Sequence, residues 1–556
     1  MQVKNTAIDT GGAGFFAGLA LVALLFSWTA VSPCLDNGFI NWDETRYILN
    51  NPRIRSLAPE NVRAIFTSRD LEMYSPLSTL SYAVNYHFSG LAPKAYHAAD
   101  ISLHLANTAL AMLFVSLLLP GIWPAFLCGL FFGIHPAHVE SVAWAAERKD
   151  LLYSFFYLLA LSAYTLSLKG KKTYFAALCF FLCSLLSKPM AVTLPLALVL
   201  IDYLKLETVG RRDWINKLPF FICAAVFSAA MAQPAAAAAA EWVPIARRVV
   251  VAFYNLGFYL CTLAWPFNLS AMYVLPLGGA KSIYFFAVGV AAAAGLLWKY
   301  CRRNKTLMFG AGFYVAMLLP VLQLIPFGPV ISADRYTYLS SLGLFIGVYA
   351  AAARCWERAG PLKRKAIVLM IMLTALIFTV AARVRCAVWK DSVSLWSDTL
   401  RKQPSSGPAL AGLCSAFLRG GMDERAAACL AEAVRRYPEK DDNFFNLGLL
   451  MAKKGDLVAA RRYFEHTIEL NDKHALAHFS LGDIALLRGD PVLAERLYLE
   501  SVGLDGAFAP ALRALGNIAA SRKDSVKARQ YYERALEAGP SDPKSIELAA
   551  ALRRQP

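Results

Sequence analysis

Residues 441–474 read DDNFFNLGLLMAKKGDLVAARRYFEHTIELNDKH, and this 34-residue arrangement occurs four times in the C-terminal part of the chain. Its most regular position is a leucine, found at Leu413, Leu447, Leu481 and Leu515. A small residue follows each leucine, namely Cys414, Gly448, Gly482 and Gly516. Each copy also has an alanine and, four places later, a bulky apolar residue, at Ala426 and Leu430, Ala460 and Phe464, Ala494 and Tyr498, and Ala528 and Tyr532. A period this strict predicts a stack of similar helical units.

The pattern resembles the tetratricopeptide repeat (TPR), in which each unit is a pair of antiparallel helices. Small residues let the two helices approach closely, and the large residue fills the space between neighbouring units. Pro438 and Pro540 close two of the units. We therefore expect a mainly α protein that ends in a TPR α-solenoid. The expected repeats are 407–440, 441–474, 475–508 and 509–542, followed by a capping segment at 543–556.

The rest of the chain has the composition of a polytopic membrane protein. Of the 556 residues, 57% are hydrophobic, which is more than an ordinary soluble protein contains. Residues 1–406 carry 35 Lys and Arg against 19 Asp and Glu, whereas the remainder is nearly balanced. This basic excess either binds phosphate-bearing lipids or only reflects the positive charge of cytoplasmic loops. We expect membrane lipids as partners, and no nucleic acid.

Apolar runs between charged or proline-rich breaks predict about eleven transmembrane helices within 1–385. The first run, Phe15–Val31, has almost no positive charge before it, so we expect a retained helix rather than a cleaved signal peptide. We interpret Val249–Pro266 as interfacial or re-entrant, because a crossing there would invert all later topology. The expected spans are 14–33, 98–119, 122–137, 151–168, 173–187, 190–204, 216–232, 281–298, 307–325, 338–354 and 366–382.

The connections between these spans predict the orientation. Basic connections such as Lys169–Lys172 and Lys363–Lys365 fall on one side, which the positive-inside rule makes cytoplasmic. The opposite, extracytoplasmic side then receives the loop 34–97 and the TPR arm, which a linker at 386–406 joins to the membrane domain.

The eleven cysteines show no C-x-x-C spacing of the kind that binds metals. Cys414 and Cys429 fall on the two helices of the first repeat, where they would be able to pair in an oxidising compartment. We prefer the interpretation that they are small packing residues.

The loop after the first helix contains adjacent carboxylates, Asp43 and Glu44, in the stretch N-W-D-E-T-R-Y. Acids near a membrane surface, with an aromatic residue before them and Arg46 after them, are what a general base or a metal anchor at the lipid interface needs. Two acids in a loop are equally typical of a solvated surface.

A second constellation, H-P-A-H-V-E, places His135, His138 and Glu140 where a helix leaves the bilayer. These three side chains include potential ligands for a divalent cation, but the proline spoils the i, i+4 geometry of a zinc helix. A hydrogen-bonding network is the alternative. Ionisable groups at this depth are costly, which favours a functional role.

Basic residues on the same side are Arg148, Lys188 and Arg335. A single Lys or Arg at a helix end usually extends to lipid headgroups. Several that converge with carboxylates predict a pocket for a lipid phosphate, because they neutralise its charge.

At these residues the chain resembles the bacterial relatives of the transmembrane and TPR repeat-containing O-mannosyltransferases, within the glycosyltransferase C (GT-C) superfamily. The matching segments occur in order along nearly the whole chain. They are N-W-D-E-T-R-Y-I-L-N-N-P, Y-S-P-L-S, Y-H-A-A-D-I-S-L-H-L-A-N, H-P-A-H-V-E-S-V-A-W-A-A-E-R-K-D-L-L, S-K-P-M-A-V-T-L-P, D-R-Y-T-Y-L-S-S-L-G and the trailing repeats.

The resemblance implies a GT-C membrane fold, a polyprenyl-phosphate-linked sugar as donor, and a catalytic carboxylate in the first extracytoplasmic loop. That role falls to Asp43 or Glu44; the relatives often carry Asp-Asp, so Glu44 is the departure. The implied location is the bacterial cytoplasmic membrane, with the active site and the TPR arm on the extracytoplasmic side. No cofactor is certain, and a divalent cation at His135, His138 and Glu140 stays open.

The mechanism that fits these residues is inverting sugar transfer. Asp43 or Glu44 would take the proton of the acceptor hydroxyl, and His138 with Glu140 would orient the base or the acceptor. Arg148, Lys188 and Arg335 would bind the donor phosphate, where positive charge meets the charge that grows as the bond breaks. Surrounding residues in a supporting role are Arg46, His135, Asp150, Asp334 and Tyr336.

The TPR arm offers an extended concave surface for a polypeptide, and we expect it to bind the acceptor protein, whose Ser/Thr hydroxyls would receive the sugar. A scaffold for envelope assembly is the alternative for the arm and, without catalysis, for the whole chain. A transporter is a third possibility, although neither mid-helix charges nor internal symmetry is evident. The scaffold and the transporter both rank below the transferase.

Overall fold

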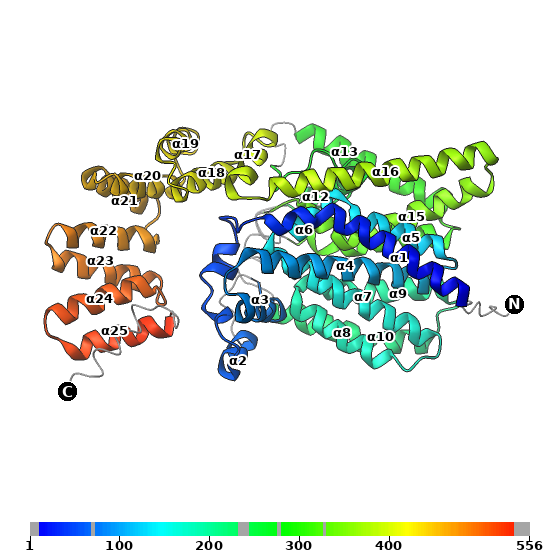
Figure 1. The fold of residues 1–556 in the computed structure, drawn as a ribbon, viewed down its shortest axis with the longest axis horizontal. Coiled ribbons are helices and arrows are strands. Elements are labelled where there is room, and N and C mark those ends of the chain that lie inside the picture. The colour runs from blue at the N-terminus through cyan, green and yellow to red at the C-terminus, as the bar shows by residue number, and fades with distance from the viewer. Residues whose placement is uncertain (1–9, 68–72, 232–243, 275–279, 326–329, 539–556) are drawn as a thin grey trace. The chain divides into compact units, whose positions relative to one another are not determined.

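The computed structural model describes residues 10–67, 73–231, 244–274, 280–325 and 330–538 (Figure 1). Every regular element in these ranges is a helix. The chain divides into two compact units. The first unit comprises 1–49 and 56–404, and the second comprises 50–55 and 405–556.

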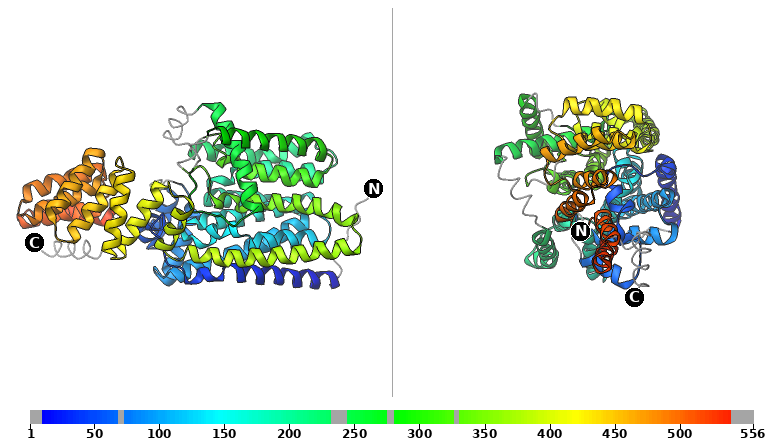
Figure 2. Two further views of the ribbon diagram at one scale, coloured as in Figure 1. Left: turned by 90° about the horizontal axis from the view of Figure 1, so that it is seen from above. Right: turned by 90° about the vertical axis from the view of Figure 1, so that its left-hand side faces the viewer.

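The first unit is a bundle of long, mostly apolar helices, seen from two further directions in Figure 2. Its longer helices are α1 (Thr10–Val31), α4 (Pro93–Leu118), α5 (Ile122–Ile134), α7 (Arg148–Leu168), α8 (Tyr174–Ser187), α9 (Leu194–Lys205), α10 (Arg211–Met231), α12 (Ile245–Ala264), α13 (Ala280–Cys301), α14 (Lys305–Leu318), α15 (Thr337–Glu357) and α16 (Pro361–Val388). Its shorter elements are η1 (Ser32–Asp36), η2 (Thr45–Leu49), α2 (Pro59–Thr67), α3 (Pro76–Ser89), η4 (Pro136–His138), α6 (Val139–Ala143), η5 (Ala145–Glu147), η6 (Pro189–Thr193), η8 (Leu319–Val321), η9 (Asp334–Tyr336) and α17 (Ser392–Lys402).

Each of the eleven expected spans corresponds to a helix of this unit. Seven helices are long and apolar enough to cross a membrane, and the pair α5 and α6, bent by 54°, raises the number to eight. Helices such as α8 and α14 are apolar but shorter than a full span. The expected number of about eleven therefore exceeds the number of full-length spans in the described part of the chain.

Apolar side chains on the outer helices support a membrane environment. Leu369 and Met372 on α16 are 66% and 64% exposed, and Phe285 on α13 is 77% exposed. Contiguous exposed apolar surface of this kind is unfavourable in water and is stable when lipid chains cover it. The first unit is thus a multi-pass membrane bundle.

The expected linker at 386–406 contains helix α17, which packs within the first unit. Trp396 Nε1 donates a hydrogen bond to Asn41 Oδ1 at 2.7 Å, and Arg385 Nη1 pairs with Asp398 Oδ2 at 2.8 Å. The boundary between the units lies at residues 404 and 405. Helix α17 is therefore part of the support of the first loop rather than a spacer.

The second unit consists of four helix pairs. They are α18 (Gly407–Arg419) with α19 (Asp423–Arg436), α20 (Asp441–Lys453) with α21 (Leu457–Leu470), α22 (Ala475–Leu487) with α23 (Pro491–Leu504), and α24 (Ala509–Ser521) with α25 (Ser525–Ala538). The short element η3 (Pro52–Ile54) belongs to this unit by its contacts. The expected cap at 543–556 lies outside the described residues.

The glycines of the repeat are where the paired helices touch. A Cβ atom at Gly482 would lie 2.5 Å from the ring of Tyr498, and one at Gly448 would lie 2.4 Å from the ring of Phe464. These are the small and large residues of the sequence pattern, and their contact confirms the reason for their spacing.

The preferred interpretation of Cys414 and Cys429 as unpaired packing residues is wrong. The two residues form a disulfide that joins α18 to α19. Their Cα atoms are 5.3 Å apart, which is within the range that a disulfide spans.

Candidate active site

The candidate site is formed where several helices of the first unit end on one side of the bundle, near α3, α6 and α17 in Figure 1. Proline begins two of the short turns there, at Pro136 and Pro189. Because the residue before a proline is disfavoured in helical conformation, His135 and Lys188 adopt extended backbone angles and end α5 and α8. The following residues turn inward rather than continuing the helices.

A buried carboxylate, Glu147, is the centre of an ion-pair network. Its Oε1 lies 3.2 Å from Lys149 Nζ and 3.5 Å from Arg335 Nε, and its Oε2 lies 3.3 Å from Lys188 Nζ. All four side chains are at most 8% exposed. Buried ions remain charged only when they are paired this closely, so each member depends on the others.

Two further carboxylates complete the network. Arg335 Nη1 donates to Glu140 Oε1 at 2.5 Å, and Lys188 Nζ donates to Asp150 Oδ1 at 2.5 Å. The second oxygens of Glu140 and Asp150 have no protein partner in the described part of the chain. One cluster thus contains residues from α6, η5, α7, η9 and the start of η6. The sequence analysis predicted a common side for these residues but not their contacts.

Arg148 lies apart from this network, although the sequence analysis grouped it with Lys188 and Arg335. Its Nε pairs with Asp100 Oδ1 at 2.5 Å, and its other nitrogens donate to Tyr96 O at 3.0 Å and to Asn85 Oδ1. The guanidinium also lies over the ring of Tyr82, 4.8 Å from its centroid. These contacts join α7 to α3 and α4 and occupy the donors that would otherwise bind a phosphate.

The two histidines form hydrogen bonds within the bundle. His138 Nδ1 is 2.8 Å from Phe132 O and its Nε2 is 3.0 Å from Ser341 Oγ. His135 Nε2 is 3.0 Å from Leu263 O, and its Nδ1 accepts from the N–H of Ala137 at 3.2 Å. With these contacts, the hydrogen-bonding alternative describes the histidines of H-P-A-H-V-E better than a ligand set.

Potential metal ligands within 4.8 Å of one another occur elsewhere in the described residues. That group is Asp441, Asp442 and His474, in the second and third repeats. The structure does not bring His135, His138 and Glu140 together in this way, because Glu140 faces Arg335 instead.

The adjacent acids of the first loop differ in environment. Glu44 is 1% exposed; its Oε1 accepts from the N–H of Ala145 at 2.9 Å and its Oε2 from the N–H of Ile40. Burial raises the pKa of Glu44 to about 8, against the effect of these donors. Asp43 is half-buried, and its carboxylate interacts electrostatically with Lys149 of the network. Asp43 is therefore partly accessible from outside the loop, whereas the hydrogen bonds of Glu44 stabilise the conformation of the loop.

Aromatic rings hold the loop in this position. Trp42 stacks on Trp144 with ring centroids 4.2 Å apart, and it contacts Trp396 of α17 at 5.0 Å. The guanidinium of Arg335 lies 5.3 Å from the centroid of the Trp144 ring. The ring of Trp144 therefore contacts both the first loop and the network.

The remaining expected residues lie at the edge of the network. Asp334 is buried, and its Oδ1 accepts from Tyr273 Oη at 2.6 Å. Tyr336 is 8% exposed, and the guanidinium of Arg335 lies 5.0 Å from its ring centroid. Arg46 is exposed on η2. Asp334 and Tyr336 therefore support the network, whereas Arg46 faces outward.

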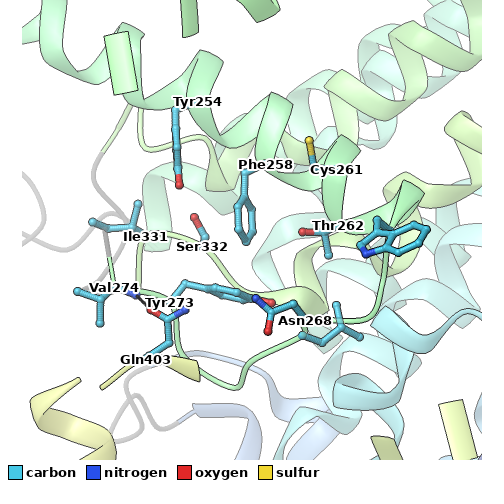
Figure 3. A pocket seen from close by; sticks show the side chains of 12 residues that line it. Tyr254, Phe258, Cys261, Thr262, Asn268, Tyr273, Val274, Ile331, Ser332 and Gln403 are labelled. Atoms are coloured by element: carbon cyan, nitrogen blue, oxygen red, sulfur yellow. Dashed lines mark hydrogen bonds between the residues drawn. The ribbon is translucent and has the colours of Figure 1, made fainter. Parts of the chain in front are cut away.

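A cavity of about 440 Å³ lies on the other side of Tyr273 (Figure 3). It is formed by α12, the loop after α12, the segment before η9 and the end of α17. Its lining residues are Tyr254, Phe258, Cys261, Thr262, Trp265, Asn268, Leu269, Tyr273, Val274, Ile331, Ser332 and Gln403.

The sequence analysis missed three members of the charged region, Glu147, Lys149 and Asp100. The run E-R-K-D contains the first two, and its charge density at a helix start was the available signal. Asp100 lies in the apolar helix α4, where an acid is costly without a partner. That rule predicts a buried cation opposite Asp100, and Arg148 is that cation.

Comparison with known proteins identifies the C-terminal repeats and finds relatives of the chain. A model of the tetratricopeptide repeat family matches residues 415–466, 445–509 and 507–543. Among solved structures, a thermophilic TPR protein from Thermus thermophilus is 22% identical and covers 34% of this chain and 98% of its own, with a TM-score of 0.26.

Several homologues of the chain are named protein O-mannosyl-transferases. Tmtc1 of Drosophila melanogaster is 32% identical over 189 residues, which are 32% of this chain and 22% of the relative. TMTC2 of Homo sapiens is 44% identical over 92 residues, or 16% and 11%. The protein F38B6.6 of Caenorhabditis elegans is 23% identical over 421 residues, or 69% and 58%.

The chain thus spans between about a tenth and three fifths of the length of these relatives. It is a multi-pass helical chain with C-terminal TPR repeats, and it is similar in sequence to proteins named protein O-mannosyl-transferases.

Proposed function

We propose that the chain is a membrane glycosyltransferase of the GT-C type, which transfers a sugar from a polyprenyl-phosphate donor to a protein hydroxyl. The position of Asp43 supports this most directly. Its carboxylate is half-buried beside the cation Lys149, at the edge of a buried charge network. A general base needs partial access to substrate together with fixed neighbours, and Asp43 has both.

In this mechanism the acceptor oxygen attacks the anomeric carbon while the bond from that carbon to the phosphate oxygen breaks. Asp43 takes the proton of the acceptor hydroxyl, and the configuration of the sugar is inverted. The departing phosphate gains negative charge, which cations fixed in advance stabilise. We assign this role to Lys188 and Arg335 with Lys149; Arg148 fixes α7 against α3 and α4.

The TPR unit would bind the polypeptide acceptor on its concave face. We place this unit and the site on the extracytoplasmic side of a bacterial cytoplasmic membrane. The disulfide between Cys414 and Cys429 supports that side, because disulfides persist in oxidising compartments.

The test is transfer of mannose from a synthetic polyprenyl-phosphate mannose to extracytoplasmic proteins by the full chain in lipid nanodiscs. Mannose is the first choice because the relatives are named O-mannosyl-transferases. Transfer by the wild type that is lost in Asp43→Asn supports the proposal. Absence of transfer across a panel of sugar donors and acceptors would contradict it and favour a scaffold.

A further inference from the structure

The cavity beside Tyr273 combines aromatic faces with polar groups (Figure 3). Tyr254 and Phe258 are four residues apart on α12, so their rings lie on one face of that helix. Tyr273 lies across from them, with its ring centroid 4.8 Å from that of Phe258 and the ring planes at 76°. Such rings offer flat apolar faces of the size of a small cyclic ligand.

Several polar groups of the lining have free hydrogen-bonding capacity. Thr262 lines the cavity and is only 8% exposed. Gln403 Oε1 accepts from the N–H of Val274 at 3.4 Å, which leaves its amide NH₂ as a donor. Ser332 donates to Asn255 Oδ1 at 2.8 Å, so its oxygen remains an acceptor. A ligand that carries hydroxyl groups would form hydrogen bonds with such groups in place of water.

The lining contains no Asp, Glu, Lys, Arg or His among its twelve residues. The cavity therefore favours a neutral group over a phosphate. A prenyl chain would cover the polar groups of Thr262, Asn268 and Gln403 and would offer them no hydrogen bonds in place of those to water, which is unfavourable. A sugar ring satisfies them and stacks on the aromatic faces. The volume of about 440 Å³ lies in the range of small-molecule pockets.

A hydrogen bond links the wall of the cavity to the charge network. Tyr273 Oη donates to Asp334 Oδ1 at 2.6 Å, and the next residue, Arg335, pairs with Glu140 and Glu147. The second oxygen of Asp334 has no partner among the described residues. Tyr273, which lines the cavity, is thus linked through Asp334 to the cation assigned to the donor phosphate.

We infer that this cavity binds the neutral pyranose ring of the donor, so that the residues around Phe258 and Tyr273 determine which sugar is transferred. The inference rests on the proposed function, in which Arg335 meets the donor phosphate. Thr262 and Asn268 are the residues that read the sugar hydroxyls, and Phe258 supplies the stacking face.

Binding of two lipids to the full chain in nanodiscs tests this inference without requiring turnover. The probes are polyprenyl-phosphate mannose and the same polyprenyl phosphate without sugar. The variants are Thr262→Val, which keeps the shape and removes the hydroxyl, and Asn268→Ala at an exposed position. The control is Thr208→Val, which is exposed and outside the cavity lining. Unfolding temperatures of all variants show whether each is folded.

We expect each cavity variant to bind the sugar-bearing lipid about ten-fold more weakly, because one hydrogen bond to a sugar hydroxyl is lost. Binding of the sugar-free lipid should not change in these variants. The control variant should bind both lipids as the wild type does. Equal weakening for both lipids would overturn the inference, because the cavity would then hold the prenyl chain. Unchanged binding of both lipids would overturn it as well. If sugar-specific binding responds as expected while no transfer occurs, the sugar site stands and the proposed reaction falls.

Discussion

Glu44 Oε1 accepts a hydrogen bond from the backbone N–H of Ala145 at 2.9 Å, across 101 residues of sequence. This contact fixes the first loop against the start of η5, next to Glu147. It also separates the roles of two adjacent acids, because Glu44 is enclosed whereas its neighbour Asp43 remains half-buried beside Lys149.

The burial of Glu44 predicts a pH dependence of stability. Its pKa is raised from 4.5 in the unfolded chain to about 8 in the fold, so between these values the folded state holds a proton that the unfolded state has lost. The contribution is therefore fully present below pH 4.5 and is lost as the pH rises through 8. We expect the unfolding temperature of the wild type to fall from pH 5 to pH 9 more steeply than that of Glu44→Gln, which resembles the protonated acid. Equal slopes would contradict the assigned environment.

The network around Glu147 predicts a large loss of stability when its centre is neutralised. Glu147→Gln leaves Lys149, Lys188 and Arg335 with one fewer charge to balance them, and breaking a buried ion pair lowers the free energy of unfolding by about 3–5 kcal/mol. Thermal unfolding in nanodiscs measures the effect, with the exposed Glu207→Gln as the matched control. If Glu147→Gln is as stable as the control, the charge of Glu147 does not stabilise the fold and the prediction is wrong.

The sequence predicted the repeats well because their signal is local. Leu481, Gly482 and Tyr498 lie within one 34-residue unit, and their contacts repeat in the next. The charge network is different, because Glu147 meets Lys188 over 41 residues and Arg335 meets Glu140 over 195. Only the packing of α7, η6 and η9 brings these side chains together. The sequence therefore predicted that these residues lie at the same end of the helices, and it did not show which of them pair.

The same reason explains the roles that sequence could not assign. Arg148 and Lys149 are neighbours on one helix, yet Arg148 faces Asp100 on α4 and Lys149 faces Glu147. The rotation of α7 decides between these partners, and composition does not report it. The shared aromatic contacts of Trp144 were hidden for the same reason.

The disulfide of the first repeat predicts a thiol count. Cys414 and Cys429 are paired, so a denatured, unreduced sample should expose nine reactive thiols of eleven, and all eleven after reduction. Mass spectrometry after alkylation measures this directly. Loss of the bond in Cys414→Ser should lower the stability of the repeat by about 3 kcal/mol, given a closed loop of 15 residues. Eleven reactive thiols in protein taken from an oxidising compartment would contradict the pairing.

Close packing in the repeats predicts opposite effects at two glycines. Gly482→Ala places a Cβ atom 2.5 Å from the ring of Tyr498 and should lower the unfolding free energy by about 1–3 kcal/mol. Gly503→Ala, on α23 with no atom within 4 Å, should be neutral or raise it by up to about 1 kcal/mol. The two variants are compared by thermal unfolding of the full chain, with limited proteolysis as the probe of unfolding in the repeats. Equal effects would show that the helices do not need the small residue.

Mannose transfer by wild type and Asp43→Asn, side by side, tests the central claim most directly. The control is Glu60→Gln, at an exposed position. Rates are compared only if the three proteins have similar unfolding temperatures. If Asp43 is the base, its amide variant loses transfer by about 10²–10⁴-fold while the control keeps wild-type rates. Wild-type rates in a folded Asp43→Asn protein would contradict the catalytic assignment.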